Sequence, residues 1–170
     1  MNIFILDKNP KKCAKSLWYS SPLRANKQIL ELAQIMSTAL SQGFKIKNKT
    51  LYKPINSKNP ICTWAEHPEN FTWCYELFKE LNSLFIEKSL KKKNHSSFEK
   101  LNPIFKKYRW IWYSQKPVKI WQNSSMFKTE ENITKAYNKT IFEKIKNDLS
   151  EKIISENQFN KQKEYLSLAS

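Results

Sequence analysis

The chain has 170 residues, of which 40% are hydrophobic and 14% aromatic, so it is long and apolar enough to fold as one domain with a real core. It carries 30 Lys and Arg against 15 Asp and Glu, a net charge of +15, and it has a single glycine. One glycine is too few for the glycine-rich loops of P-loop and dinucleotide-binding proteins, which excludes both classes. The sequence has no run of about 18 apolar residues, so we expect no membrane-spanning helix.

The excess of positive charge predicts an anionic partner. Nucleic acid is the first candidate, because neutralising phosphates is the commonest use of such a charge, and an anionic membrane surface is the second. We favour DNA. The cysteines Cys13, Cys62 and Cys74 have no metal-ligand spacing, and the two histidines lie far apart. We therefore expect reduced thiols in a cytoplasmic protein, with no metal and no cofactor.

Three elements are predicted near the N-terminus. Residues 2–6 are apolar and predict a short arm, either a strand or an extended segment packed on the core. The Asn-Pro pair that follows predicts a helix over about 9–18. The best-delimited helix runs over 20–43: a serine can cap its start, Pro22 suits the first turn, and Gly43 stands where a C-terminal cap prefers glycine.

The helix over 20–43 has two faces. At about 100° per residue, one face is apolar and comprises Ile29, Leu32, Ala33, Met36 and Leu40. The opposite face is polar and comprises Arg24, Lys27, Glu31, Gln34 and Thr38. This polar face is either an ordinary solvated surface or an active-site wall that carries one acid and two bases.

A basic loop and two helices are predicted next. Over 44–60 lysine alternates with Phe, Ile, Leu and Tyr, and Pro54 and Pro60 favour an ordered loop over a hairpin. Such a loop can contact phosphates or can simply be solvated. Short helical turns are expected over 61–66, and a long helix with an apolar stripe is expected over 68–90.

The segment after the long helix is basic and includes His95, which we interpret as a phosphate ligand or as a solvated side chain. Ser96, or the serine after it, predicts the start of another short helix, and Glu99 completes a capping-box spacing from Ser96. The dipeptide Asn102-Pro103 predicts an interruption of that helix.

Residues 105–121 mix aromatic and cationic side chains. Aromatic rings stack on bases while cations hold phosphates, so the mixture suits a strand with exposed or flipped bases. The alternative is that the rings are core residues and the lysines cover the surface. The predicted contacts of this stretch are Lys106, Lys107, Arg109, Trp110, Trp112, Tyr113 and Lys116.

The C-terminal part predicts two polar helices, over about 129–148 and 150–167, the first with acidic residues in its first turn. We expect them to pack on the domain or to mediate association. The predicted fold is therefore all-α: a helical domain over 1–122 with a short N-terminal arm, and a helical extension over 123–170.

Several segments resemble a family of small phage and marine-metagenome proteins labelled pyrimidine-dimer DNA glycosylases. They are MNIFILDKNPKKCAK, KQILELAQIMSTAL, LYKPINSKNPICTWAEHPENFTWCYELF, KKKNH and KPVKIW, which together span roughly residues 1–122. In that family the helix over 20–43 carries a D-K-H…K…E pattern, similar to the catalytic helix of phage endonuclease V. Glu31 and Lys27 match the pattern, whereas Arg24 stands in the place of the His and Pro22 in that of the Asp.

The resemblance implies a DNA repair N-glycosylase that acts on a damaged or modified base, with abasic-site lyase activity as an extension. A carboxylate beside the sugar stabilises the charge that builds up as the base leaves, and Glu31 is our choice for it. Arg24 would bind the neighbouring phosphate. A lyase needs an amine for a Schiff base, for which Lys27 and the Met1 amine are the candidates.

Three other interpretations stay open. Lys27 and Glu31 also fit an ordinary ion pair four residues apart on a helix, worth a few tenths of a kcal/mol. The loss of the family His and Asp favours a non-catalytic nucleic-acid-binding phage accessory protein. An RNA-directed enzyme or toxin-like factor would use the same basic and aromatic surface.

Overall fold

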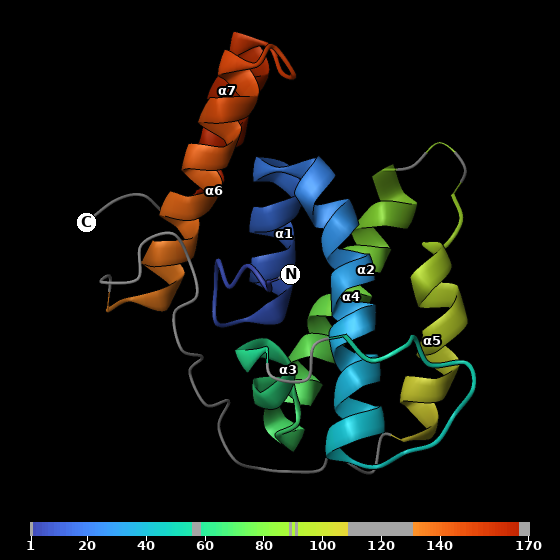
Figure 1. Ribbon diagram of the computed structural model, residues 1–170. Helices are drawn as coiled ribbons and strands as arrows, with labels where there is room; N and C mark the ends of the chain where they lie inside the picture. Colours follow the sequence, from blue (N-terminus) through green and yellow to red (C-terminus); the bar gives the residue numbers. More distant parts are fainter. Residues whose placement is uncertain (1, 56–58, 89, 91, 109–130, 167–170) are drawn as a thin grey trace.

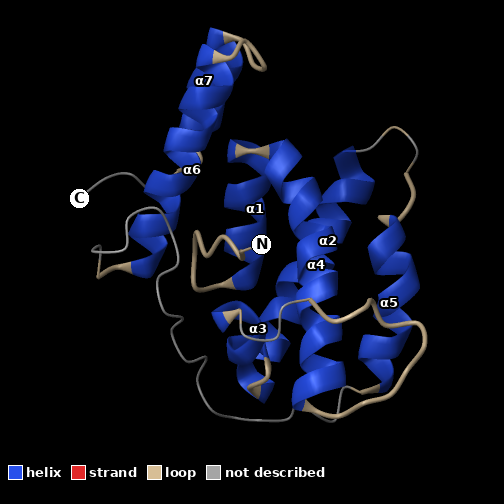
Figure 2. Cartoon of the chain, in the orientation of Figure 1, coloured by secondary structure: helices blue, strands red, loops and turns tan. Residues whose placement is uncertain are grey.

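The structure is a computed structural model that describes residues 2–55, 59–88, 90, 92–108 and 131–166. Within these residues all regular structure is helical and the packing is compact, which confirms the all-α prediction (Figures 1 and 2). The helices are α1 (Pro10–Ser20), α2 (Pro22–Thr38), α3 (Pro60–Ala65), α4 (Pro68–Lys88), α5 (Ser96–Lys107), α6 (Ile133–Ser150) and α7 (Glu156–Lys163), with a π-helical turn η1 (Ala39–Gly43) after α2.

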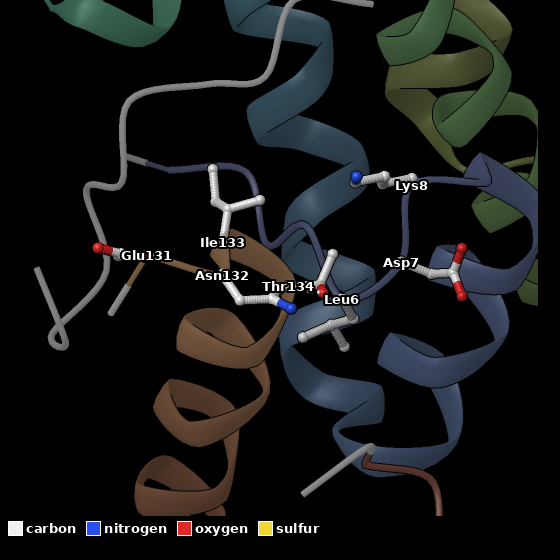
Figure 3. A pocket seen from close by; sticks show the side chains of 7 residues that line it. All are labelled: Leu6, Asp7, Lys8, Glu131, Asn132, Ile133 and Thr134. Atoms are coloured by element: carbon white, nitrogen blue, oxygen red, sulfur yellow. Dashed lines mark hydrogen bonds between the residues drawn. The ribbon is translucent and has the colours of Figure 1, made fainter. Parts of the chain in front are cut away.

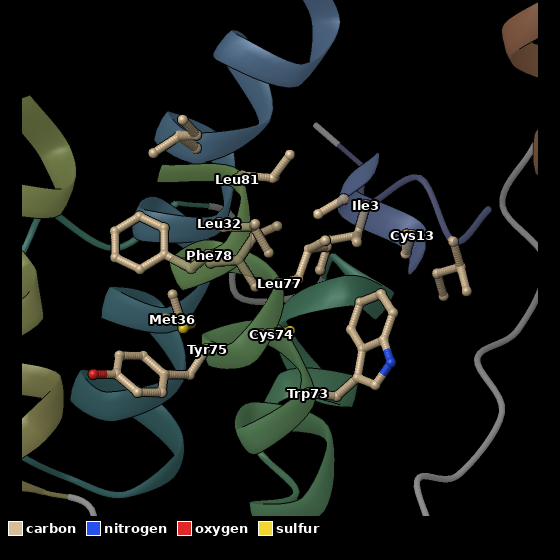
Figure 4. Packing of buried hydrophobic residues seen from close by; sticks show 14 of the residues in the cluster. Ile3, Cys13, Leu32, Met36, Trp73, Cys74, Tyr75, Leu77, Phe78 and Leu81 are labelled. Carbon is tan, nitrogen blue, oxygen red and sulfur yellow. The ribbon is translucent and has the colours of Figure 1, made fainter. Parts of the chain in front are cut away.

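The core lies where α4 packs against α1 and α2. The apolar stripe predicted for the helix over 20–43 is completely buried there, and α5 packs on α2 and α4 from the other side. Figure 4 shows Leu32 and Met36 of α2 facing Phe78 and Leu81 of α4, with Ile3 of the N-terminal arm nearby. These contacts leave the opposite face of α2 for polar side chains.

The starts of α1 and α2 follow the predicted signals. The side chain of Asn9 caps α1 by accepting hydrogen bonds from two backbone amides of its first turn. Pro22 opens α2 with Ser21 at the N-cap position, but the Ser21 side chain makes no capping hydrogen bond. Its hydroxyl instead accepts a hydrogen bond from Arg24 Nη1 at 3.0 Å, so Ser21 positions that guanidinium.

The prediction for Gly43 was wrong. Gly43 has no positive φ and ends the π-helical turn η1, whereas the left-handed position falls two residues later on Lys45, with φ 56°. Glycine is required here for lack of space, because a Cβ added at this position would lie 2.4 Å from Cγ of Glu66. Close approach of the Glu66 side chain, rather than a cap, therefore favours glycine at this position.

The N-terminal arm is held by buried polar side chains from two helices. Gln28 of α2 is fully buried: its Oε1 accepts a hydrogen bond from the Phe4 amide, and its Nε2 donates to the Asn2 carbonyl. From α6, the Asn138 side chain donates to the Leu6 carbonyl at 3.1 Å. The arm thus joins α2 to α6, and its extended backbone has these hydrogen bonds satisfied without a sheet.

The predicted interruption at Asn102-Pro103 was wrong, because α5 continues through it to Lys107. Buried Leu101 and Phe105 flank the proline on the core side and hold the helix in place. Proline removes only the one amide that would bond the carbonyl of Glu99, and Glu99 itself is exposed to water.

The C-terminal helices differ from the prediction at their ends. The first, α6, begins four residues later than expected, with Asn132 as its N-cap and no acidic residue in its first turn. A turn over 151–155 then separates it from α7, which is shorter than expected. Since buried α6 residues such as Tyr137 and Ile141 belong to the same hydrophobic cluster as the arm, this region packs on the domain.

Candidate functional site

Arg24, the first residue of the predicted active-site wall, is engaged by another helix. Its Nη1 and Nη2 donate to the two carboxylate oxygens of Asp148 in α6, at 2.5 and 2.9 Å. The two side chains are only 22% and 12% exposed. This bidentate pair ties α2 to α6 and occupies the fork that we expected to bind a phosphate. Sequence reasoning missed Asp148 because 124 residues separate it from Arg24.

Lys27 and Glu31 form the expected pair on the same face of α2. Lys27 Nζ lies 3.7 Å from Glu31 Oε1, with the lysine side chain 73% exposed and the glutamate side chain 14% exposed. An ammonium this exposed gains little from the pair. The structure therefore places a largely covered carboxylate beside a solvated amine, an arrangement open to both the catalytic and the structural interpretation.

The two cavities that the described residues line lie away from this face of α2. One cavity of about 570 Å³ lies between the N-terminal arm and the start of α6, and its wall includes Asp7, Lys8 and Glu131 (Figure 3). A second, of about 530 Å³, lies between α1, α4 and α7. Neither is lined by Arg24, Lys27 or Glu31, so the catalytic roles of these three residues stay predictions.

The predicted basic loop is ordered and two-faced over its described part, residues 44–55. Its apolar side chains pack against the core, whereas its lysines are exposed. At its C-terminal end the Ile55 amide donates to Thr38 Oγ1 of α2 at 3.1 Å, so one residue of the predicted polar wall serves to hold the loop. The alternation in the sequence therefore separates core contacts from solvent-facing cations.

The loop runs beside α5 and is hydrogen-bonded to the start of that helix (Figure 1). Near the start of α5, the Tyr52 hydroxyl donates to Ser97 Oγ at 3.1 Å. Near its end, Phe105 and the loop residue Phe44 both pack edge-on against Phe71 of α4, with ring centroids 5.9 and 6.1 Å apart. These contacts hold the loop and α5, which both carry exposed lysines, beside each other.

We call this region the loop–α5 basic surface. Lys100 lies over the Tyr52 ring at 4.6 Å, and Lys107 over that of Tyr108 at 5.9 Å. Lys106 and Lys107 also complement the C-terminal end of the α5 dipole, the usual structural role of such residues. No member of the surface forms an ion pair with any residue that the structure describes. Its members are Lys45, Lys47, Lys49, Lys53, Lys100, Lys106 and Lys107.

His95, predicted as a phosphate ligand or a solvated side chain, caps α5. Its Nδ1 accepts a hydrogen bond from the Ser97 amide at 3.2 Å, and its ring packs edge-on against Phe85. The N-cap is therefore His95, and the capping box predicted from Ser96 is wrong. Burial lowers the pKa of His95, which favours the neutral ring that a cap acceptor requires.

The remaining predicted contacts, Arg109, Trp110, Trp112, Tyr113 and Lys116, lie outside the described residues. Within the described part, no three or more His, Cys, Asp or Glu side chains gather as a metal site would require. Burial raises the pKa of the Cys13 and Cys62 thiols to about 11 and raises that of Cys74 as well, so these thiols are neutral and unsuited to nucleophilic attack. No helix in the same part is long and apolar enough to cross a bilayer.

Comparisons with protein-family models, with curated proteins and with solved structures returned no match. The resemblance to the pyrimidine-dimer glycosylase family therefore stays a prediction from the quoted segments.

Proposed function

We propose that this chain is a DNA-binding protein and that the loop–α5 basic surface is its principal contact. The main observation in support is that seven exposed lysines of an ordered loop and helix have no carboxylate partner among the described residues. Like charges held together repel one another, so such a surface gains most from a polyanion. The sequence continues from Lys107 directly into the predicted stacking residues, which supports DNA with accessible bases.

Replacing Lys47, Lys49 and Lys53 by Gln tests this surface. We expect duplex and single-stranded DNA to bind about tenfold more weakly in fluorescence anisotropy. The slope of log affinity against log salt should fall by about 0.9 for each duplex phosphate that the variant no longer neutralises. The matched control replaces Lys11, Lys12 and Lys146 by Gln. These lysines are exposed on α1 and α6, and their replacement removes the same amount of charge. Equal weakening in both variants would mean that binding follows net charge alone and would reject this surface.

The catalytic part of the proposal is N-glycosylase action on a damaged or modified base, with Glu31 as the carboxylate. The supporting observation is its side chain, only 14% exposed and 3.7 Å from the Lys27 amine. We expect Glu31→Gln to abolish base release from a panel of lesions while leaving DNA binding nearly intact, with the exposed Glu156→Gln as control. Full activity in Glu31→Gln would remove Glu31 from the mechanism.

Lyase activity would require a Schiff base. Borohydride reduction of a mixture with abasic DNA would trap the covalent complex, and a comparison of Lys27→Ala with N-terminally blocked protein separates the two candidate amines. Met1 lies outside the described residues.

The second candidate function is a non-catalytic nucleic-acid-binding accessory protein. The Arg24–Asp148 pair favours it, because a guanidinium held by a carboxylate is not available to a lesion phosphate. It predicts tight, salt-sensitive binding to undamaged DNA without product on any lesion. Competition with RNA of the same length separates an RNA-directed protein from both.

The described cysteines are free and buried, which supports the reducing, cytoplasmic setting proposed from the sequence.

A further inference from the structure

A second cavity lies at the end of the bundle where α1 ends, α2 begins and α7 crosses. It has a volume of about 530 Å³, within the usual range of small-molecule sites. Its wall combines three aromatic rings, two lysines and side-chain amides, and none of the described residues that line it is acidic. Because α2 has 17 residues, this cavity lies about 25 Å from the end of α2 where the loop–α5 basic surface starts.

The aromatic part of the wall offers a stacking surface. Tyr19 of α1 and Tyr165, just after α7, stack with ring centroids 4.8 Å apart and an interplanar angle of 25°. Tyr165 remains 40% exposed in this pair, so ring area is left for a ligand. Trp18 is 8% exposed and forms the floor, where it packs edge-on against Phe85. Planar rings on a rigid wall suit a planar, aromatic ligand.

Two cations line the same cavity. Lys161 of α7 is exposed and forms no ion pair with a described residue. Lys88 of α4 lies over the Tyr19 ring at 5.6 Å, and its Nζ is 2.7 Å from Glu87 Oε1. The neighbouring carboxylate raises the pKa of Lys88 and already neutralises this ammonium, so Lys161 is the cation left for a ligand. The ligand that fits therefore carries an anionic group as well as a ring.

Gln162 adds a hydrogen-bonding requirement. Its Oε1 is buried and has no hydrogen-bond partner in the described part of the chain, whereas Oε1 of the neighbouring Gln158 accepts hydrogen bonds from Ser155. A buried acceptor without a donor costs free energy, and rotation of the Gln162 side chain toward the cavity that it lines would let a ligand N–H satisfy this oxygen.

We propose that this cavity binds one nucleotide unit. The base stacks on Tyr165, an exocyclic amine or ring N–H donates to Gln162 Oε1 once that side chain turns toward the cavity, and the phosphate lies beside Lys161. The site differs from the loop–α5 basic surface in place and in chemistry, and it does not depend on the proposed DNA binding. The nucleotide is either a free monophosphate or the phosphorylated end of a strand.

The test is calorimetry on full-length protein carrying the Lys47, Lys49 and Lys53 to Gln changes, which removes competition from the other surface. Adenosine monophosphate is expected to bind about tenfold more tightly than either adenosine or inorganic phosphate. Lys161→Gln is expected to weaken nucleotide binding several-fold and to leave adenosine binding unchanged. Tyr165→Leu is expected to weaken both. Lys163→Gln, on the same helix but outside the cavity, is the control.

A 5′-phosphorylated trinucleotide is titrated in parallel to show whether the bound nucleotide is free or is the end of a strand. Binding of the monophosphate supports a free nucleotide, and binding of the trinucleotide alone supports a strand end. The proposal is overturned if neither ligand exceeds inorganic phosphate in affinity, or if Lys163→Gln weakens binding as much as Lys161→Gln does. Because the test uses no duplex and no lesion, its failure is distinct from failure of the proposed function.

Discussion

The polar face of α2 and the loop–α5 basic surface both carry cations, but they differ in what surrounds those cations. On α2, Arg24 and Lys27 each face a carboxylate, from α6 and from the same helix. On the loop and α5, seven lysines have no carboxylate partner among the described residues. Cations with partners contribute to the fold, whereas cations without partners leave charge for another molecule. The following changes test that distinction.

Arg24→Ala is expected to have the largest effect on stability. It leaves the Asp148 carboxylate partly buried without its partner, which should cost about 2 to 3 kcal/mol of unfolding free energy and lower Tm by about 5 to 10 °C. Differential scanning calorimetry measures the change, and a double-mutant cycle with Asp148→Asn isolates the pair. Lys79→Ala, from the more exposed pair with Glu76, is the control. An equal loss of stability in that variant would contradict the larger contribution that we expect from Arg24.

His95→Asn tests whether His95 belongs to the fold or to the basic surface. Since its pKa is lowered in the folded state, the unfolded state binds the proton more readily, so stability is complete above the ordinary His pKa of about 6.5 and falls as the pH drops below it. Asn keeps the cap without titrating, so the unfolding free energy measured with denaturant should fall less between pH 7 and pH 5 in the variant than in the parent. If both proteins show the same pH dependence, His95 does not control it.

Lys27→Gln is expected to change the unfolding free energy by only a few tenths of a kcal/mol, because the lysine side chain is 73% exposed. The small difference should vanish at 1 M salt, where the Debye length is about 3 Å. A loss as large as that expected for Arg24→Ala would show that the two cations of the α2 face are equivalent.

The loop–α5 basic surface should show the smallest effect on stability. The triple change of Lys47, Lys49 and Lys53 to Gln removes three unpaired charges, and we expect the unfolding free energy to stay within about 0.5 kcal/mol of the parent in urea. A clear loss of stability would mean that these lysines hold the loop itself, which would make the expected fall in DNA affinity uninformative.

Local patterns predicted most of the helices. The Asn9-Pro10 start, Pro22 and the buried face of α2 all rest on contacts within about four residues, which a sequence displays directly. The same kind of reasoning failed where a distant contact decided the outcome. Gly43 meets Glu66 of another segment, and the core contacts of Leu101 and Phe105 carry α5 through Pro103.

The candidate site was also predicted only where local sequence patterns determine it. The pairing of Lys27 with Glu31 follows from helical spacing, and the exposed lysines of the loop follow from its alternation with apolar residues. Nothing in the sequence linked Arg24 to Asp148 or placed Tyr165 on Tyr19, because each pair joins segments that meet only when the C-terminal helices pack.

By itself, then, the sequence of this protein determined its helices, their buried faces and a large excess of positive charge, since periodicity, caps and composition are local or additive properties. Only the tertiary structure decided which cations are neutralised. Packing of α6 brought a carboxylate to Arg24 and no described carboxylate to the loop–α5 lysines, because charge pairing depends on distances of a few ångströms between segments far apart in the chain.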